Sequence, residues 1–290
     1  MQYGTVNGCK ISRLGLGTKR FPTEDSSRVV HLDVKTASAI FQAAIDGGVD
    51  FFDTSYSNHK GEAESFLGDE FAKVAKPLPV CTSFFEMVDP RYEYVFQKQL
   101  KKLGKERIDF YAIEGVTDIN KEVNVESGAI DYFFERKEAG QIAQIGFNSE
   151  LSPDELAKFL KRYPWDFVRM RINFFDWFEG RTREAYEIAS EAGVPILAHG
   201  ALRVGPASLL KEDALAVLRQ GGAHRSSVEW GLMFVKSLEN VRSVSCNVHS
   251  VEQIESDIAV FADDAVLSDS EMEMLKEAAR AQRGACGRRS

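Results

Sequence analysis

Ionisable and polar side chains recur where short apolar runs of this sequence end. Carboxyl, imidazole and guanidinium groups that lie together can move protons and bind anions, which is the work of general acid–base catalysis. The residues in question are Asp53, Glu114, Asn148, Ser149, Arg169, Arg171 and His199. If the apolar runs are parallel strands of a barrel, these ends meet at one mouth, and we expect a site there for a small-molecule substrate.

Each of these residues also has a purely structural interpretation. Asp53 follows two phenylalanines and could cap the next turn. Glu114 ends an apolar run, where a lone carboxylate is costly, so we expect it to have a partner or to stay protonated. Arg169 and Arg171 share one strand face; inside a barrel one of them would pair with Glu114 or bind an anion, and outside it they form a solvated stripe. His199 is equally compatible with a half-buried structural histidine.

Eight short apolar runs alternate with helical patterns along almost the whole chain, which is the βαβα signature. The predicted strands are Leu14–Gly17, Phe51–Asp53, Val80–Phe84, Ile108–Glu114, Ile142–Phe147, Phe167–Ile172, Pro195–Ala198 and Val241–Ser245, after a hairpin at Gln2 to Ser12. We therefore predict an α/β protein in which residues 1–290 form one domain, a single (β/α)8 TIM barrel with an N-terminal β-hairpin. A doubly wound sheet is the alternative, but the segment Gly15 to Arg20 lacks the third glycine of its nucleotide-binding motif.

Capping residues mark the helices that must hold these strand ends in place. A double glycine at Gly47 stops the first helix. Asp89 before Pro90 predicts the start of another. Ser250, with Gln253 three residues later, predicts a capping box at the helix that follows the last strand.

Composition excludes several classes of protein. The 290 residues are 44% hydrophobic and 28% charged, unlike disordered, collagen-like or disulfide-rich chains. The net charge is −8 and the basic residues are scattered, so no nucleic-acid partner is expected. No apolar run approaches the ~20 residues that span a bilayer, so we expect a cytoplasmic protein without membrane contact. The four cysteines and five histidines lack the spacing of ligands or disulfides, so free thiols and no metal are expected. Oligomeric state is not indicated.

Several motifs resemble those of the aldo-keto reductases. The stretch Ile11 to Thr18 is similar to their entry strand, and Gly47 to Gly68 is similar to their G-x-x-F-F-D-T-A-x-x-Y-x-x-G-x-S-E-x-x-L-G signature. Gly140 to Ser149 resembles G-K-I-R-x-I-G-F/V-S-N, and Leu202 to Gly205 and Val251 to Glu255 resemble the late L-x-x-G and E-Q-x-E elements. The resemblance implies a barrel oxidoreductase that reduces a carbonyl or enone with a nicotinamide cofactor.

The resemblance also implies a catalytic set of Asp, Tyr, Lys and His, with the Tyr as proton donor. Asp53 matches the Asp, but Asn58, Ser83 and Glu114 occupy the Tyr, Lys and His positions. Asparagine cannot act as an acid and serine supplies no positive charge, so ordinary carbonyl reduction is expected to be very slow. The remaining proton donors are Glu114, because the family's reductases of steroid double bonds carry Glu there, and Tyr56, if an extended segment aims it to the same side as Asn58.

The implied cofactor is NADP or NAD, held by residues at the strand ends. The residues expected to hold it are Thr18, Asn148, Ser149, Arg169, His199, Leu202, Ser250 and Gln253. Asn148 and Ser149 resemble the family's S-N pair in swapped order, and Arg169 replaces the usual Gln beside the nicotinamide carboxamide. Residues 246–250 contain no Lys or Arg for a 2′-phosphate, so the preference for NADP is expected to be weaker than usual. The branch that the chain resembles most carries a cysteine-rich tail; only Cys286 remains here, so no iron–sulfur cluster is expected.

Three functions are compatible with this pattern. The first is an aldo-keto-reductase-like oxidoreductase with a remodelled site. The second is a catalytically silent barrel that binds a nucleotide or a protein partner. The third is a non-redox enzyme that uses Asp53, Glu114, Arg169 and His199. The family resemblance favours the first, and the replaced residues favour the other two.

Overall fold

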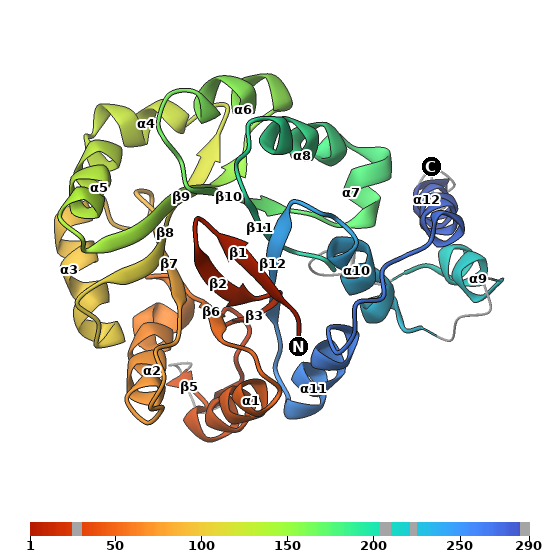
Figure 1. Ribbon diagram of the computed structural model, residues 1–290, viewed down its shortest axis with the longest axis horizontal. Coiled ribbons are helices and arrows are strands. Elements are labelled where there is room, and N and C mark those ends of the chain that lie inside the picture. Colours follow the sequence, from red (N-terminus) through yellow and green to blue (C-terminus); the bar gives the residue numbers. More distant parts are fainter. Residues whose placement is uncertain (25–30, 203–209, 221–224, 285–290) are drawn as a thin grey trace.

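Eight parallel strands close into a barrel in the computed structural model, which describes residues 1–24, 31–202, 210–220 and 225–284. Around the barrel the strands follow the order of the chain, and helices surround them (Figure 1). The strands are β3 (Leu14–Gly17), β6 (Phe51–Asp53), β7 (Val80–Phe84), β8 (Ile108–Thr117), β9 (Ile142–Glu150), β10 (Phe167–Arg171), β11 (Ile196–His199) and β12 (Val241–Asn247). The predicted (β/α)8 barrel is confirmed.

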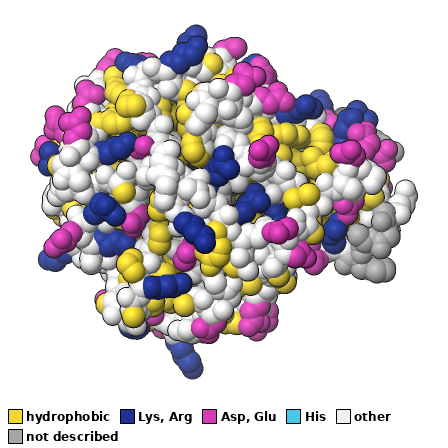
Figure 2. Space-filling view, in the orientation of Figure 1, with side chains coloured by type: hydrophobic (Ala, Val, Ile, Leu, Met, Phe, Trp, Pro, Cys, Tyr) yellow, Lys and Arg dark blue, Asp and Glu magenta, His cyan; other side chains and the backbone are white. Residues whose placement is uncertain are grey.

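A hairpin closes the N-terminal end of the barrel, as the sequence predicted. Strands β1 (Tyr3–Val6) and β2 (Cys9–Ser12) pair antiparallel and lie across the barrel opening that faces the viewer in Figure 1. Val6 and Ile11 are fully buried against an interior layer that includes Phe51, Phe110 and Phe167. Basic and acidic side chains intermingle on this face (Figure 2). The carboxyl ends of the strands, where barrel enzymes carry their sites, therefore face the opposite way.

Helices cover the outside of the barrel. They are α1 (Val34–Asp46), α2 (Glu62–Phe71), α3 (Tyr92–Leu103), α4 (Lys121–Glu126), α5 (Ala129–Glu138), α6 (Pro153–Leu160), α7 (Phe174–Glu179), α8 (Thr182–Glu191), α9 (Glu212–Gln220), α10 (Ser227–Lys236), α11 (Val251–Val260) and α12 (Asp269–Gly284). Helix α1 ends at Gly47, as predicted, and buries Ile40 and Phe41. Helices α9 and α12 pack together at one edge of the molecule (Figure 1). No helix in the described part of the chain combines the length and apolar character needed to cross a membrane.

Several predicted boundaries were wrong. The helix expected at Pro90 begins at Tyr92, because the Asp89 carboxylate accepts hydrogen bonds from the backbone and side chain of Arg91 and so caps a turn instead. Strands β8 and β9 run about three residues past their predicted ends, since they pair again beyond an irregularity between Ile113 and Val116. Such irregularities change the direction of nearby side chains, and this one includes Glu114.

Candidate active site

A charged cluster links three strands at the mouth of the barrel. Asp53 ends β6, Glu114 lies on β8 and Arg169 lies on β10. The Arg169 guanidinium donates from Nη2 to Asp53 Oδ2 and from Nη1 to Glu114 Oε1, both at 2.8 Å. Of the alternatives open for Arg169, partnership with Glu114 is therefore confirmed. The two carboxylates occupy both terminal nitrogens, so Arg169 is an internal counter-ion and not a free anion clamp.

Burial and charge oppose each other within this cluster. Burial raises the pKa of Asp53, and the Arg169 guanidinium and the Ser245 hydroxyl offset part of that rise. Burial alone would lower the pKa of Arg169, but the Asp53 and Glu114 carboxylates raise it above its ordinary value. Arg169 is therefore a permanent cation here. The Glu114 side chain keeps 22% of its exposure, against 9% for Asp53, so Glu114 is the more accessible carboxyl group.

His199 and Asn148 form a second pair at the mouth, on β11 and β9. The His199 ring nitrogen Nε2 lies 2.8 Å from Asn148 Oδ1. Burial lowers the pKa of His199 to about 3, and the neighbouring cations Arg169, Arg171 and Lys19 contribute. The imidazole is therefore neutral at pH 7 and donates from Nε2 to the amide oxygen. This bond leaves the NH2 group of Asn148 to donate elsewhere, and it removes His199 from the candidates for proton transfer.

The low pKa of His199 predicts a loss of stability in acid. The unfolded chain binds this proton near pH 6.5 and the folded chain near pH 3, so between these values protons favour unfolding. Part of the ring still meets solvent, so we expect about 1 to 2 kcal/mol to be lost from this group between pH 7 and pH 5. His199→Gln keeps a donor for Asn148 but has no proton to gain. Urea unfolding at both pH values should show a smaller loss for the variant, and equal losses would contradict the assignment.

The residues after β6 do not form the extended segment that the sequence suggested. A turn at Tyr56 leads into a short 3-10 helix at Asn58–Gly61. Asn58 Nδ2 donates to Thr18 Oγ1 at 3.0 Å, whereas the Tyr56 ring lies under Lys102 Nζ, 5.1 Å away on α3. Alternation fails in a turn, so Tyr56 and Asn58 point to different sides. Tyr56 thus lies against helix α3, and no contact joins it to the charged cluster among the described residues.

Ser83 lies on β7, between the strands that carry Asp53 and Glu114. Its side chain shares the interior face with Cys81, which belongs to the layer under the hairpin. The hydroxyl is buried and has no hydrogen-bond partner among the described residues. A buried hydroxyl without a partner is costly, and here it marks a polar position at the mouth that a substrate atom could satisfy.

The residues predicted to hold a cofactor do not all face the mouth. Strand β9 continues to Glu150, so Asn148 and Ser149 point to opposite faces, and only Asn148 looks inward. The Thr18 side chain is fully buried and its hydroxyl is used by Thr54 and Asn58. Leu202 packs against Gly231 of α10. The late motif begins at Leu202, but its residues 203–205 lie outside the described residues. Cys286 also lies outside them.

Helix α11 begins beside the mouth, after β12. Ser250 caps it by accepting from the Gln253 backbone N–H at 3.4 Å, which confirms half of the predicted capping box. The other half is wrong, because Gln253 Oε1 accepts from the backbone N–H of His249 and not from that of Ser250. Strand β12 pairs with β3, and Asn247 Oδ1 accepts from the Lys19 backbone N–H. The first turn of α11 therefore follows a segment that binds the backbone of Lys19, and a helix N-terminus is a setting that suits phosphate.

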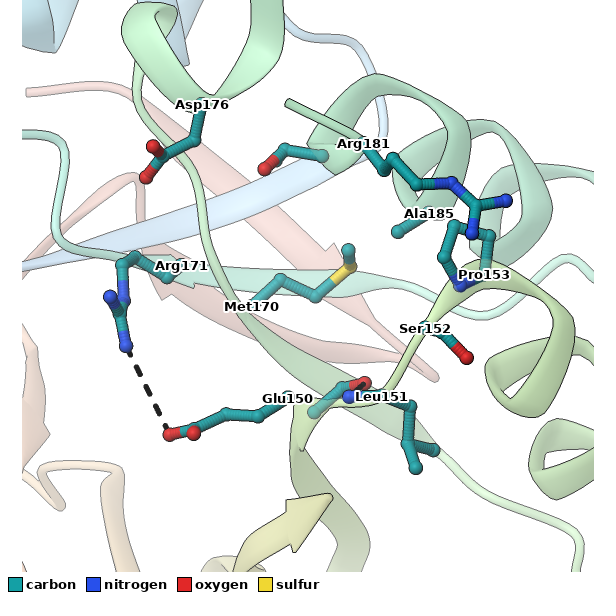
Figure 3. A pocket seen from close by; sticks show the side chains of 11 residues that line it. Glu150, Leu151, Ser152, Pro153, Met170, Arg171, Asp176, Arg181 and Ala185 are labelled. Atoms are coloured by element: carbon teal, nitrogen blue, oxygen red, sulfur yellow. Dashed lines mark hydrogen bonds and ion pairs between the residues drawn. The ribbon is translucent and has the colours of Figure 1, made fainter. Parts of the chain in front are cut away.

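A cavity of about 380 Å³ opens on the rim, between the ends of β9 and β10 and helices α6, α7 and α8 (Figure 3). Arg171 and Arg181 lie on opposite sides of Met170 in this view. Arg171 Nη2 is 4.0 Å from Glu150 Oε1, and its side chain is more than half exposed. The cavity is lined by Ser149 and Arg171 but not by Arg169. It is thus a neighbour of the mouth and not the space above the charged cluster.

Two residues at the mouth were missed by the sequence analysis. Ser245, whose hydroxyl lowers the pKa of Asp53, ends the predicted last strand and could have been found by its position there. Phe85 follows β7, and a Cβ at Gly115 would lie 2.7 Å from its ring. Within the described residues, Cys9, Cys81 and Cys246 are free thiols, and no group of three His, Cys, Asp or Glu residues could hold a metal ion.

Comparison with known proteins gives a consistent result. The model of the Aldo/keto reductase family matches residues 13–280. The uncharacterized oxidoreductase YqkF of Bacillus subtilis (strain 168) is 25% identical over 284 residues, which cover 92% of this chain and 86% of that protein. This match and the family model both span most of the chain.

Solved structures share the fold at lower sequence identity. The holo form of aldo-keto reductase AKR11C1 from Bacillus halodurans has a TM-score of 0.76 at 22% identity, covering 97% of this chain and 96% of that chain. An aldo-keto reductase from Klebsiella pneumoniae in complex with NADPH has a TM-score of 0.75 at 17% identity, covering 96% and 95%. These structures bear on the fold of the chain and not on its substrate.

Proposed function

Because this chain belongs to the aldo/keto reductase family of oxidoreductases, which use nicotinamide cofactors, we propose that it transfers a hydride between NADP or NAD and a small organic substrate, with a remodelled set of residues for proton transfer. The reduced nicotinamide supplies the hydride when it is bound. Asp53, Glu114, Arg169 and Ser83 form the wall on which the substrate would lie.

The observation that carries this proposal is the arrangement of Asn148, Arg169 and His199 on three adjacent strands. His199 orients the Asn148 amide, so its NH2 group can donate to the oxygen of a carboxamide. On the neighbouring side, the first turn of α11 and Lys19 suit the phosphates. These groups support the binding of a nicotinamide nucleotide at both of its ends. Arg169 would line the same site without giving up its carboxylate partners.

The test of this proposal is a fluorescence titration of the protein with NADPH and NADH. We expect saturable binding to the wild-type protein. Asn148→Ala should bind about tenfold more weakly, because the substitution removes roughly one hydrogen bond at a buried site. Asn7→Gly is the matched control, because Asn7 lies on the hairpin at the other end of the barrel with a positive φ that suits glycine. Absence of binding to either nucleotide would contradict the proposal.

The choice between NADPH and NADH is expected to be weak. Residues 246–250 supply no Lys or Arg, and His249 and Gln253 are hydrogen-bonded to each other. A guanidinium or ammonium clamp for a 2′-phosphate is thus missing from this part of the site. We expect the two dissociation constants to differ by less than about tenfold, or roughly 1.4 kcal/mol. A larger preference for NADPH would show that another cation contacts the phosphate.

A catalytically silent barrel is the second candidate function. It is favoured by the engagement of Asn58 with Thr18 and of Tyr56 with Lys102, and by the neutral state of His199. Turnover separates the two candidates, because a silent barrel would bind the nucleotide and oxidise none of it with any substrate.

A further inference from the structure

Charge is divided unevenly across the mouth. The cations Arg171 and Lys19 lie on the side of His199, where together with Arg169 they help to lower its pKa. The side formed by β6 and β8 carries the carboxyl groups of Asp53 and Glu114. On that side two carboxyl groups face a single guanidinium, and Glu114 offers a second carboxylate oxygen beyond the one that Arg169 binds. The acidic side thus carries more carboxyl groups than cations among the described residues, while the other side suits phosphate.

Two further groups complete the acidic side. The Ser83 hydroxyl lies between the strands of Asp53 and Glu114, buried and without a partner among the described residues. The Phe85 ring lies over Gly115, next to Glu114; this close approach requires glycine, whose φ is +65°. Phe85 thus adds an aromatic ring over the residue that follows Glu114 in the chain, and an aromatic face attracts an organic cation more than a neutral molecule of the same shape.

Within the described residues, the mouth also lacks an unpaired acid for the proton that carbonyl reduction consumes, because the Glu114 carboxylate is bound by Arg169. Hydride addition to a neutral carbonyl leaves an alkoxide, which needs a proton from an acid. Asn58 is bound to Thr18, the Tyr56 ring lies against Lys102, and His199 is neutral. Hydride addition to an iminium ion needs no acid, because a C–H bond forms, the C=N π pair moves to nitrogen, and the product is a neutral amine.

We infer that the acidic side of the mouth, made of Asp53, Ser83, Phe85 and Glu114, binds a small organic cation, and that the substrate class of this protein is an iminium ion. This inference rests on the proposed function for the hydride, which the reduced nicotinamide donates as it is oxidised. The carboxylate of Glu114 would also hold a bound imine in its protonated form.

The test measures binding apart from turnover. Calorimetry without nucleotide compares the N-methylpyrrolinium cation, a cyclic iminium, with cyclopentanone, a neutral ring of the same size. We expect the cation to bind at least about ten times more tightly, and Glu114→Gln to abolish that preference. Phe85→Leu should reduce it about two- to fivefold, the worth of one aromatic face. Glu122→Gln, which removes a carboxylate from an exposed ion pair with Arg162, should leave it unchanged.

Equal affinity for the two probes, or a preference that survives Glu114→Gln, would overturn the inference. If Glu114→Gln does not fold, the inference is tested by the preference of the wild-type protein for the cation and by the reduction of that preference in Phe85→Leu. Turnover with NADPH separates this inference from the proposed function. Reduction of the ketone but not of the iminium ion would overturn the inference alone. Failure to bind any nicotinamide would overturn the proposed function, and the calorimetric comparison would still decide the cation site.

Discussion

Replacing Arg169 with glutamine is expected to lower the free energy of unfolding by about 3 to 5 kcal/mol at pH 7. The substitution leaves Asp53 and Glu114 without their shared counter-ion, and a partly buried charge that loses its partner is strongly destabilising. The deficit should shrink in acid, because burial already raises the pKa of Asp53 and protonation removes one of the two charges. Urea unfolding at pH 7 and pH 5 measures both effects.

Arg162→Gln provides the matched control for this prediction. Arg162 also binds a carboxylate, that of Glu122, but both side chains are 40% or more exposed, and such pairs contribute at most about 1 kcal/mol. Combining Arg169→Met with Asp53→Asn and Glu114→Gln should recover most of the lost stability, since no charge then remains buried. If Arg169→Gln costs no more than Arg162→Gln, the cluster is more hydrated than the structure indicates.

Reduction of neutral aldehydes and ketones is expected to be about 10²- to 10⁴-fold slower than by a family member that carries the tyrosine donor, which is the usual contribution of a positioned acid. Asn58 and Ser83 cannot replace that acid and its activating cation. The measurement is kcat/KM over a panel of aldehydes, ketones and enones, with the tyrosine-bearing relative assayed in parallel.

Two variants identify the source of any residual activity. Glu114→Gln is expected to reduce it further, by roughly tenfold, because Glu114 is the most accessible carboxyl group of the cluster. Tyr56→Phe should leave it unchanged, because its ring lies against Lys102. Robust aldehyde turnover that neither substitution affects would show that the reacting atoms lie elsewhere.

Much of the fold could be predicted from the sequence because barrel strands are short and fully buried. Three strands, β3, β6 and β7, have the predicted bounds, and the hairpin lies where the sequence placed it. The polar residues Asp53, Glu114 and Arg169 were identified for the same reason, since each follows apolar residues of a predicted strand. Their convergence is a property of closed parallel sheets, which bring all carboxyl ends to one mouth.

The details of the site depended on information that the sequence does not contain. That Arg169 also reaches Asp53 follows from the curvature and stagger of the closed sheet, which bring β6 within reach of β10. The orientation of Tyr56 depends on a turn, and that of Ser149 depends on β9 continuing past its apolar residues. The hydrogen-bond partners of the Thr18 side chain lie in the loop after β6. This loop has no periodic sequence pattern from which they could be predicted.

The assembly of the charged cluster has a consequence for how the chain folds. Arg169 meets Glu114 across 55 residues and Asp53 across 116, so both ion pairs close long loops. Such distant contacts form after the pairing of neighbouring strands. An incomplete barrel that lacks β10 would hold two carboxylates beside each other with no counter-charge. At neutral pH, repulsion between them would oppose closure of such a barrel until the last strands dock.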